Sequence, residues 1–383
     1  MRICIINPYY DAVPETPLEV TGQYRHVEAL AAALAKRGHD VTVIQALQDD
    51  KSERRNGVEF RYARTPRRSA FRLSGGPLGM DLLSSSNLKG IIQALEQAQP
   101  DAVHMNGITL LQPVRAIGNW CEMRRRPLTA SHHGGTPRRN PWLRAAHRKA
   151  LSTCRGVFFT TQQHALPWIS VGVLRERQVV SCMEVSSTFS PADRSSARKR
   201  TGMRGSPVFV WNGGLHKRKD PLTALKGFSL IRRQWAEARL YMIYVSQEML
   251  KDVQQAIADD PHLTSSVEMR GFIPPASVEN FLNSADFIVQ SSLSEYSGYS
   301  VLEAMACGVV PVVTDIPSFR AMTNDGRHGV LFPVGNYELM AEQVLARDLS
   351  DLPAVSQGVR AFFAEALSYD AIAEIYERAL VLS

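Results

Sequence analysis

The sequence lacks the marks of a membrane-spanning, secreted or disulfide-bonded protein. Its apolar runs all fall short of the roughly 18 residues that a membrane-spanning helix needs. Residues 1–6 form a strand-like run and not the basic start, long apolar core and cleavage site of a secretion signal. The five cysteines are scattered and form no Cys-x-x-Cys pair, which argues against a disulfide framework and against a zinc site. We therefore expect a protein of the reducing cytosol.

The sequence also has no nucleic-acid-binding module, although its net charge is +7. Residues 1–190 hold 25 Lys and Arg against 15 Asp and Glu, whereas residues 191–383 hold 19 against 22. The basic half predicts attraction to acidic lipid, phosphorylated glycan or, least of all, nucleic acid. A solvated arginine-rich surface explains the charge equally well. The arginines concerned are Arg54, Arg55, Arg61, Arg64, Arg67, Arg68, Arg124, Arg125, Arg126, Arg138 and Arg139.

The length predicts two domains, since one domain usually takes ~100–200 residues. Strands and helices alternate along both halves, which is typical of α/β domains with parallel sheets. The predicted strands are 2–7, 40–45, 101–105, 128–131, 208–211, 239–245, 268–272, 286–290 and 309–314. The predicted helices are 23–37, 221–235, 337–347, 369–382 and one that starts at Ser300. The segment 192–206 is polar, basic and poor in apolar residues, which indicates a linker between a domain at 1–191 and a domain at 207–366.

Residues 294–315 form the most informative segment of the chain. Glu295 lies in a loop of Gly, Ser and Tyr, and Glu303 follows inside the predicted helix. The helix start offers unpaired N–H groups of Gly298, Tyr299 and Ser300 to a phosphate, and a carboxylate can accept hydrogen bonds from sugar hydroxyls. Two plainer interpretations remain: Ser300-x-x-Glu303 is also a capping box, and Glu295 is also readable as a solvated loop acid.

The same segment resembles the signature of glycosyltransferase family 4. A Glu, seven residues, Glu-Ala-Met-Ala-Cys-Gly, an apolar strand and Pro311 follow one another as in that family. Weaker matches come in the family's order at 20–27, 37–41, 101–104, 131–134, 211–221 and 270–274. The resemblance implies the GT-B fold: two doubly wound Rossmann-like domains with parallel sheets facing across a cleft. It also implies that a final helix at 367–383 crosses back to the N-terminal domain.

The resemblance implies roles for particular residues. Glu295, Lys219 and His133 would be catalytic: Glu295 binding donor-sugar hydroxyls, Lys219 neutralising the phosphates and His133 lining the sugar pocket. Glu303 would bind the ribose. The nucleotide-sugar donor would be bound by Gly22, Gly213, Gly214, Lys217, Arg218, Lys219, Phe272, Ile273, Glu295, Gly298, Tyr299, Ser300 and Glu303. The acceptor side would carry Thr21, His133, Arg54, Arg55, Arg67 and Arg68.

Several of these residues also have plain structural interpretations. The basic run Lys217–Lys219 is readable as a solvated turn. His132 and His133 are readable as hydrogen-bonded structural histidines, and no third ligand at a suitable spacing supports a metal. His104 ends a predicted strand, where a core role is equally fitting. Cys307 reads as a small buried residue and not as a nucleophile.

The chain departs from the family at one position. The family commonly has Arg five residues before the lysine, and Gly214 stands there in this sequence. The missing guanidinium removes a charge-assisted contact to phosphate. His216, Lys217 or Arg218 would have to supply that charge; otherwise donor binding weakens or the protein is a non-catalytic relative.

The sequence therefore predicts a cytoplasmic, retaining glycosyltransferase, peripheral at a membrane if its basic half contacts anionic lipid. No Asp-x-Asp motif occurs, so we expect no metal and no other cofactor besides the nucleotide-sugar donor, with UDP as the default base. The acceptor would be a hydroxyl of an anionic glycan or lipid-linked glycan, in surface polysaccharide or lipopolysaccharide biosynthesis. The alternatives are a GT-B nucleotide-sugar epimerase or hydrolase, and a degenerate, non-catalytic binding subunit.

Overall fold

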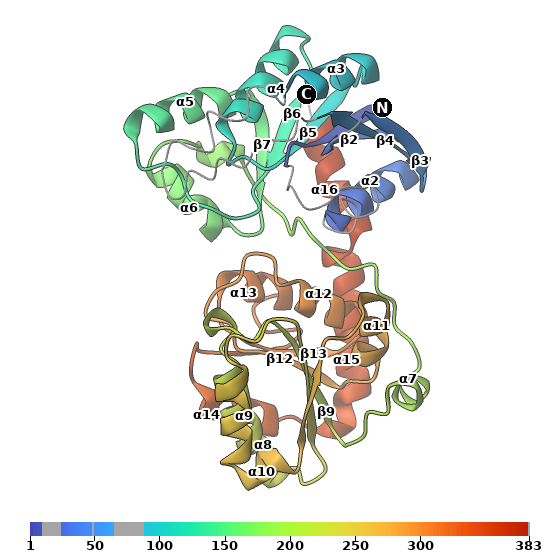
Figure 1. The fold of residues 1–383 in the computed structure, drawn as a ribbon, viewed down its shortest axis with the longest axis vertical. Coiled ribbons are helices and arrows are strands. Elements are labelled where there is room, and N and C mark those ends of the chain that lie inside the picture. The colour runs from blue at the N-terminus through green and yellow to red at the C-terminus, as the bar shows by residue number, and fades with distance from the viewer. Residues whose placement is uncertain (10–23, 48–49, 65–87, 382–383) are drawn as a thin grey trace. The chain divides into compact units, whose positions relative to one another are not determined.

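The structure is a computed structural model that describes residues 1–9, 24–47, 50–64 and 88–381. The chain forms two compact units (Figure 1). The N-terminal unit comprises Met1–Val185 together with Tyr369–Ser383, and the C-terminal unit comprises Ser186–Ser368. In the part of the chain that is described, no helix combines the length and the apolar character needed to cross a bilayer.

The N-terminal unit is built on an eight-stranded sheet in the order β3-β4-β2-β1-β5-β6-β7-β8. All neighbours pair in parallel except β3 and β4, which are antiparallel. The strands are β1 (Arg2–Asn7), β2 (Asp40–Leu47), β3 (Lys51–Arg55), β4 (Val58–Arg64), β5 (Ala102–Asn106), β6 (Leu128–Ser131), β7 (Cys154–Phe159) and β8 (Val179–Ser181). The helices are α2 (Arg25–Lys36), α3 (Leu88–Ala98), α4 (Leu111–Met123), α5 (Pro141–Leu151), α6 (Gln162–Ser170) and α16 (Tyr369–Val381).

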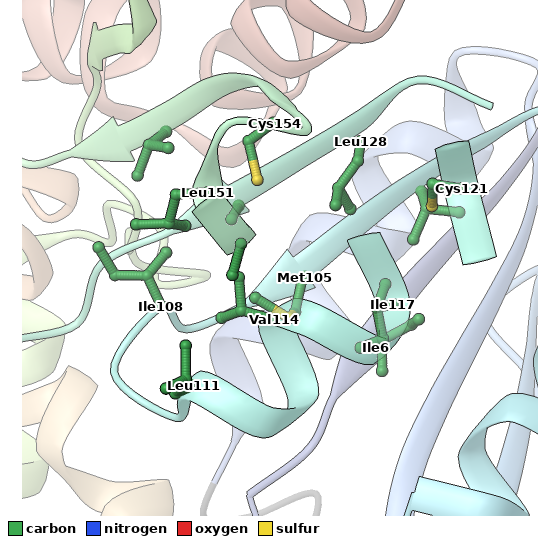
Figure 2. Close-up of a cluster of buried hydrophobic side chains, with 14 of the residues drawn as sticks. Ile6, Met105, Ile108, Leu111, Val114, Ile117, Cys121, Leu128, Leu151 and Cys154 are labelled. Atoms are coloured by element: carbon green, nitrogen blue, oxygen red, sulfur yellow. The ribbon is translucent and has the colours of Figure 1, made fainter. Parts of the chain in front are cut away.

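One buried cluster of the N-terminal unit lies between the central strands and the helices α3, α4, α5 and α6. Figure 2 shows part of it, with side chains of β1, β5, β6 and β7 packed against α4. Cys121 and Cys154 lie in this core, where burial raises the pKa of each thiol to about 12. All five cysteines are buried and free, so the interpretation of Cys307 as a small buried residue is confirmed.

The last helix, α16, is part of the N-terminal unit, where it packs on α2. The ring of Tyr376 stacks on Phe158 at 4.0 Å between centroids, and it meets His104 edge-on at 4.8 Å. At the end of α2, Arg37 pairs with Glu377 at 2.5 Å. Sequence positions more than two hundred residues apart thus share one core.

The C-terminal unit has a six-stranded, wholly parallel sheet in the order β11-β10-β9-β12-β13-β14. The strands are β9 (Val208–Gly213), β10 (Arg239–Tyr244), β11 (Val267–Gly271), β12 (Phe287–Gln290), β13 (Val310–Thr314) and β14 (Val330–Phe332). The helices are α7 (Arg194–Thr201), α8 (Pro221–Gln234), α9 (Leu250–Ala258), α10 (Pro261–Thr264), α11 (Pro275–Asn283), α12 (Tyr299–Ala306), α13 (Pro317–Thr323), α14 (Tyr337–Leu345) and α15 (Leu352–Phe362). Helix α8 packs with α9, α10 and α14, while α12 packs with α11 and α15.

The segment predicted as a linker, 192–206, contains helix α7 and belongs to the C-terminal unit. Asp193 caps the helix by accepting from the backbone N–H of Ser196, and Gly202 ends it in the left-handed conformation. Arg198 pairs with Asp286 at 2.8 Å. A polar composition was therefore misleading here, because a short helix held by a cap and an ion pair buries little apolar surface. The units divide at residues 185 and 186.

Candidate functional site

Most of the predicted donor residues lie where two neighbouring strands of the C-terminal unit end. Strands β9 and β12 are parallel partners, so the loops after Gly213 and Gln290 leave the same edge of the sheet. Ligands of doubly wound sheets bind at this carboxyl edge. The first loop contains a single turn of 3₁₀ helix, Lys217–Lys219, and the second carries Glu295.

Glu295 joins the two loops through ion pairs. Its Oε1 lies 2.5 Å from Nζ of Lys219, and its Oε2 lies 2.9 Å from Nη1 of Arg218. Only 8% of the Glu295 side chain and 12% of the Lys219 side chain are exposed, against 48% for Arg218. The interpretation of Glu295 as a solvated loop acid is therefore wrong, and so is that of the basic run as a wholly solvated turn. The carboxylate and the amine are a buried pair.

Backbone contacts hold the Glu295 loop in place. Arg218 donates to the carbonyl of Ser294 at 2.8 Å, and Ser318 donates to the carbonyl of Glu295 at 2.9 Å. Ser292 donates its hydroxyl to Oε1 of Glu295 at 2.9 Å. The buried Thr314, at the end of β13, donates to the carbonyl of Ser292 at 2.6 Å. Groups from three strand ends therefore fix one carboxylate.

The carboxylate of Glu295 is held in its ionised form. Burial raises its pKa, but the charges and hydrogen bonds of Lys219 and Arg218 outweigh burial, so that the net shift is downward from 4.5. An ionised carboxylate accepts hydrogen bonds only, as a partner of hydroxyl groups must. The side chain is thus prepared to receive hydroxyl donors.

Helix α12 begins at Tyr299, with Gly298 as its N-terminal cap. No side chain caps this helix, and Ser300 lies inside it, so the capping-box interpretation of Ser300 and Glu303 is wrong. Gly298 has φ +51°, and a Cβ added there would lie 2.9 Å from ring atom Cε1 of Phe319. Only glycine therefore fits this cap. Gly298 has no side chain that could accept from the first N–H groups of α12, which suits an anion.

Glu303, on the second turn of α12, is 7% exposed and therefore largely inside the unit. Tyr299 and Ser300 are half-buried. At the end of β11, the Phe272 side chain is 63% exposed, whereas Ile273 packs against the core of the unit. An exposed ring beside the strand end offers a stacking surface for a base.

The two glycines after β9 differ in their surroundings. A Cβ added to Gly213 would make ordinary contacts with the Lys219 chain at 3.6 Å. At Gly214 it would lie 2.6 Å from Oγ of Ser246 and 2.8 Å from Cδ2 of His216. The imidazole of His216 thus lies where an arginine side chain at position 214 would start. Lys217 is exposed and points its charge to solvent.

A second polar cluster lies at the carboxyl edge of the sheet in the N-terminal unit. Nδ1 of His133 lies 2.8 Å from Oε2 of Glu184, whose side chain is fully buried. Nε2 of His133 lies 2.8 Å from Oγ of Ser131 and within hydrogen-bond distance of Oδ1 of Asn106. Thr160 donates to the other Glu184 oxygen at 3.0 Å. This cluster joins residues that follow β5, β6, β7 and β8.

Three neighbouring histidines are neutral. Burial lowers the pKa of His26, His104 and His132 to about 3 in each case, and His133 lowers all three further. His104 bonds Thr129 at 3.0 Å, and His132 stacks on the ring of Phe159. The structural interpretation of His104 and His132 is therefore confirmed. Among the described residues, no group of three His, Cys, Asp or Glu could hold a metal ion.

The predicted acceptor-side residues are only partly described. Thr21, Gly22, Arg67 and Arg68 lie outside the described residues. Arg54 is exposed on the edge strand β3 and lies 3.5 Å from Asp40. In contrast, Arg55 pairs with Glu28 of α2 at 2.9 Å and stacks over a phenylalanine ring. The charge of Arg55 is therefore neutralised inside the protein by Glu28.

Sequence reasoning missed the partners that orient the predicted residues. Glu184 carries no motif signal, because it lies in an irregular segment after a short strand. Ser292 and Ser318 are likewise ordinary serines in the sequence. A polar residue at the end of an apolar strand, or directly after it, is a weak signal that fits Asn106 and Thr160, since strand ends meet at one edge.

The architecture and the two strand-end clusters define an α/β protein of the GT-B type. A model of glycosyltransferase family 4 matches residues 20–180, and a model of the glycosyl transferases group 1 matches residues 206–347. The chain belongs to this glycosyltransferase family. The prediction of family and fold from the double-glutamate segment is confirmed.

Named relatives are glycosyltransferases too. D-inositol 3-phosphate glycosyltransferase of Paenarthrobacter aurescens is 30% identical over 146 residues, which cover 37% of this chain and 36% of that protein. The chain thus aligns with about a third of that relative. Phosphatidyl-myo-inositol mannosyltransferase of Mycobacterium tuberculosis is 22% identical over 89% of this chain and 85% of that one. The structure of Anabaena HepE with UDP and glucose matches the whole of both chains, with a TM-score of 0.68 at 14% identity.

Proposed function

We propose that this chain is a retaining, metal-independent glycosyltransferase. It moves a hexose from a nucleotide diphosphate-sugar to a hydroxyl of a glycan or a lipid-linked acceptor. The observation that carries the proposal is the buried contact of Glu295 with Lys219, beside the uncapped start of α12. A carboxylate for hydroxyls, an amine for phosphates and a helix start whose cap residue has no side chain are the three elements that recognition of a sugar diphosphate requires.

In the transfer step, the acceptor oxygen bonds to the anomeric carbon on the face that the diphosphate leaves. The bond between that carbon and the phosphate oxygen breaks, and the acceptor proton passes to the same phosphate oxygen. Lys219 stabilises the charge that grows on the leaving diphosphate. Glu295 binds sugar hydroxyls once the amine turns from the carboxylate to the phosphate. No protein base is required by this route, which agrees with retention of the anomeric configuration.

The favoured donor is a UDP-sugar. Support comes from the likeness to HepE, which was solved in complex with UDP and glucose. The exposed ring of Phe272 lies next to a half-buried main-chain turn and suits a planar base. Gly214 removes the usual arginine, and His216 lies in its place, so His216 takes over part of the phosphate contact.

The acceptor is anionic in this proposal. Two relatives are named for inositol phosphates or phosphatidylinositol, and residues 1–190 are strongly basic. A lipid-linked acceptor would bring the protein to the inner face of a membrane as a peripheral, cytoplasmic enzyme. Surface polysaccharide or lipopolysaccharide assembly is the corresponding process.

The test is a thermal-shift screen of the full chain against UDP-, GDP- and ADP-sugars, because a ligand of the native state raises Tm. We expect the largest shift with a UDP-sugar. Nucleotide release is then followed with and without candidate acceptors. Release that needs no acceptor would indicate an epimerase or hydrolase, and no binding of any nucleotide sugar would indicate a non-catalytic subunit.

Metal dependence and stereochemistry are tested with the same assay. We expect EDTA to leave the rate unchanged and the product to keep the anomeric configuration of the donor. Loss of activity in EDTA that returns with a divalent ion contradicts metal independence. An inverted product contradicts attack on the leaving-group face.

A further inference from the structure

The longest stretch of the chain without a carboxylate side chain lies in the N-terminal unit. Residues 123–175 hold ten Lys and Arg and no Asp or Glu, and they include the helices α5 and α6. Charges of one sign attract anions from a distance, because no neighbouring opposite charge cancels their field. The ten residues are Arg124, Arg125, Arg126, Arg138, Arg139, Arg144, Arg148, Lys149, Arg155 and Arg175.

Helix α5 has a well-formed start and a firmly packed inner face. Asn140 caps the helix, because its side chain accepts from the backbone N–H of Trp142 at 2.8 Å, and Pro141 takes the first helical position. On the inner face, Ala150 and Leu151 belong to the buried cluster of the unit. The cap and the buried face hold the helix in place, so its outer face is presented to solvent in one orientation.

The outer face of α5 carries a tryptophan beside cations. The Trp142 side chain is 84% exposed, which makes it the most exposed large apolar side chain among the described residues. Lys149 lies seven positions further on and therefore on the same side of the helix. Arg139, Arg148 and Lys149 are exposed, and within the described part of the chain no carboxylate forms an ion pair with them. We call Arg139, Trp142, Arg148 and Lys149 the α5 face.

Another exposed apolar residue of the same stretch has different electrostatic surroundings. Met123, at the end of α4, is 73% exposed, and three arginines follow it. Of these, Arg124 pairs with Glu96, and Arg126 lies 3.8 Å from Asp101. Carboxylates thus offset the charges beside Met123, whereas the cations of the α5 face have no such partner. Met123 is therefore an internal control for Trp142.

An exposed indole among unpaired cations fits the headgroup layer of an anionic bilayer. The indole is favoured at that depth because its ring is apolar and its N–H donates a hydrogen bond. Lys and Arg beside it meet lipid phosphates, with their apolar stems along the membrane surface. One apolar anchor alone attaches a protein only weakly, and cations supply the second signal. Peptides, in contrast, are bound in grooves or at strand edges, and the α5 face stands out on a helix.

We propose that the α5 face docks the protein on a bilayer that contains anionic lipid. Trp142 enters the headgroup layer, while Arg148 and Lys149 bind lipid phosphates. This inference rests on the proposed function for its choice of partner, since a lipid-linked acceptor is presented at a bilayer surface. The loop that leads into α5 carries His133, a residue of the predicted acceptor side. Docking therefore brings that side of the N-terminal unit to the layer in which such an acceptor lies.

Sedimentation of the full chain with vesicles measures the docking. The vesicles contain phosphatidylcholine alone or phosphatidylcholine with phosphatidylglycerol. We expect binding to the mixed vesicles that weakens as salt is added, and little binding to the neutral ones. Trp142→Ala should weaken binding to the mixed vesicles about tenfold, because one apolar anchor is lost. Met123→Ala should leave it unchanged. Absence of binding to the mixed vesicles overturns the inference, as does undiminished binding of Trp142→Ala.

The role of the cations is tested by charge reversal. Arg148→Glu together with Lys149→Glu should weaken binding about a hundredfold at low salt, since each cation near an anionic surface strengthens binding roughly fivefold. The matched control reverses Lys199 and Lys251, two exposed lysines of the C-terminal unit, and so changes the net charge equally. The control should bind almost as well as the unmodified protein. An equal loss in both variants would show attraction to net charge alone and would overturn the assignment to α5.

Trp142 also serves as a probe of its own position. Trp120, Trp168 and Trp211 are buried and Trp235 is half-buried, so that Trp142 is the tryptophan open to lipid. Mixed vesicles with brominated acyl chains should quench part of the fluorescence of the unmodified protein, and that part should be missing in Trp142→Phe. Equal quenching of the two proteins overturns the inference. Quenching of Trp142 by a single-stranded oligonucleotide and not by the vesicles overturns it in favour of nucleic acid.

These measurements separate the inference from the proposed function. If the protein docks through the α5 face but transfers no sugar from any donor, the proposed function fails and the docking surface stands. If the protein transfers sugar but does not bind the mixed vesicles, the function stands and the inference fails.

Discussion

The carboxyl edges of the two sheets carry polar clusters of opposite character. In the C-terminal unit, Glu295 is held by two cations from one neighbouring loop, and one of these, Arg218, is half exposed. In the N-terminal unit, His133 is held by Glu184 and by neutral amides that are almost wholly buried. Ion pairs at a partly open edge can exchange partners with a charged ligand. A closed chain of amides has nothing to exchange, and it fixes one side chain instead.

One edge is therefore built to be rearranged by its ligand, and the other is built to stay unchanged. This agrees with a donor that brings two phosphates to the first edge. Replacing charged groups in the C-terminal unit should therefore affect ligand binding and turnover more than it affects the fold.

The largest effect is expected for Lys219→Ala. Loss of the amine that faces the leaving diphosphate should lower kcat about a hundredfold to a thousandfold, the range for removal of one group that stabilises developing charge. Steady-state kinetics with the preferred nucleotide sugar measures the change. The control is Lys251→Ala, an exposed lysine on α9. A loss under tenfold would exclude Lys219 from the transfer step.

Glu295→Gln should lower kcat about tenfold to a hundredfold, because the neutral amide accepts hydroxyl donors less strongly and leaves Lys219 without its partner. It should also change the dependence of stability on pH. The folded-state pKa of Glu295 is lowered, so its stabilising effect is present above the ordinary value of 4.5 and is lost as the pH falls through the folded-state value. Melting curves of both proteins at neutral and acid pH measure this. A Tm difference between them that persists undiminished in acid would contradict it.

Gly298→Ala tests whether the start of α12 is an anion site. The positive φ and the crowding by Phe319 should destabilise the protein by about 1–3 kcal/mol and weaken donor binding. Gly335→Ala is a matched control, since Gly335 has φ +77° but open space around its Cβ position. The control should lose about 1 kcal/mol and keep its donor affinity. Calorimetry with the donor distinguishes a local effect from general instability.

Gly214→Arg restores the residue that the family commonly has. Because Ser246 and His216 occupy the space, we expect a loss of about 1–3 kcal/mol and no gain in donor affinity. The double variant with His216→Ala should recover stability and bind the donor more tightly than His216→Ala alone. Full affinity of His216→Ala by itself would show that the histidine has no part in phosphate binding.

The smallest effect concerns the acceptor side. Reversal of Arg54, Arg67 and Arg68 to Glu should raise the acceptor KM several-fold at low salt and less at high salt, because salt screens the attraction between a cationic protein and an anionic acceptor. Arg55 is left intact, since its pair with Glu28 supports α2. Donor binding should stay the same. An acceptor KM that changes neither with these substitutions nor with salt would contradict the proposal of an anionic acceptor.

Much of the fold was predictable because apolar periodicity is a local property. The strands 2–7 and 128–131 match β1 and β6, and other predicted strands and helices differ from the observed bounds by one or two residues. Helix α7 was missed because its composition is that of a loop. The functional importance of Glu295 and Lys219 was predictable from a motif. Their buried ion pair was not, because the two residues are 76 positions apart in the sequence.

The amino-acid sequence was enough to predict the alternation of strands and helices, the family and the residues at the ends of β9 and β12. Only the tertiary structure decided that Glu184 meets His133, that Gln45, Asn7 and Asn106 form one chain of amides, and that His216 fills the space beside Gly214. The physical reason is the parallel sheet, which brings strand ends together irrespective of their distance along the chain. The spacing of apolar residues indicates which side of a helix or strand is buried. It does not indicate which strand ends are neighbours in the sheet.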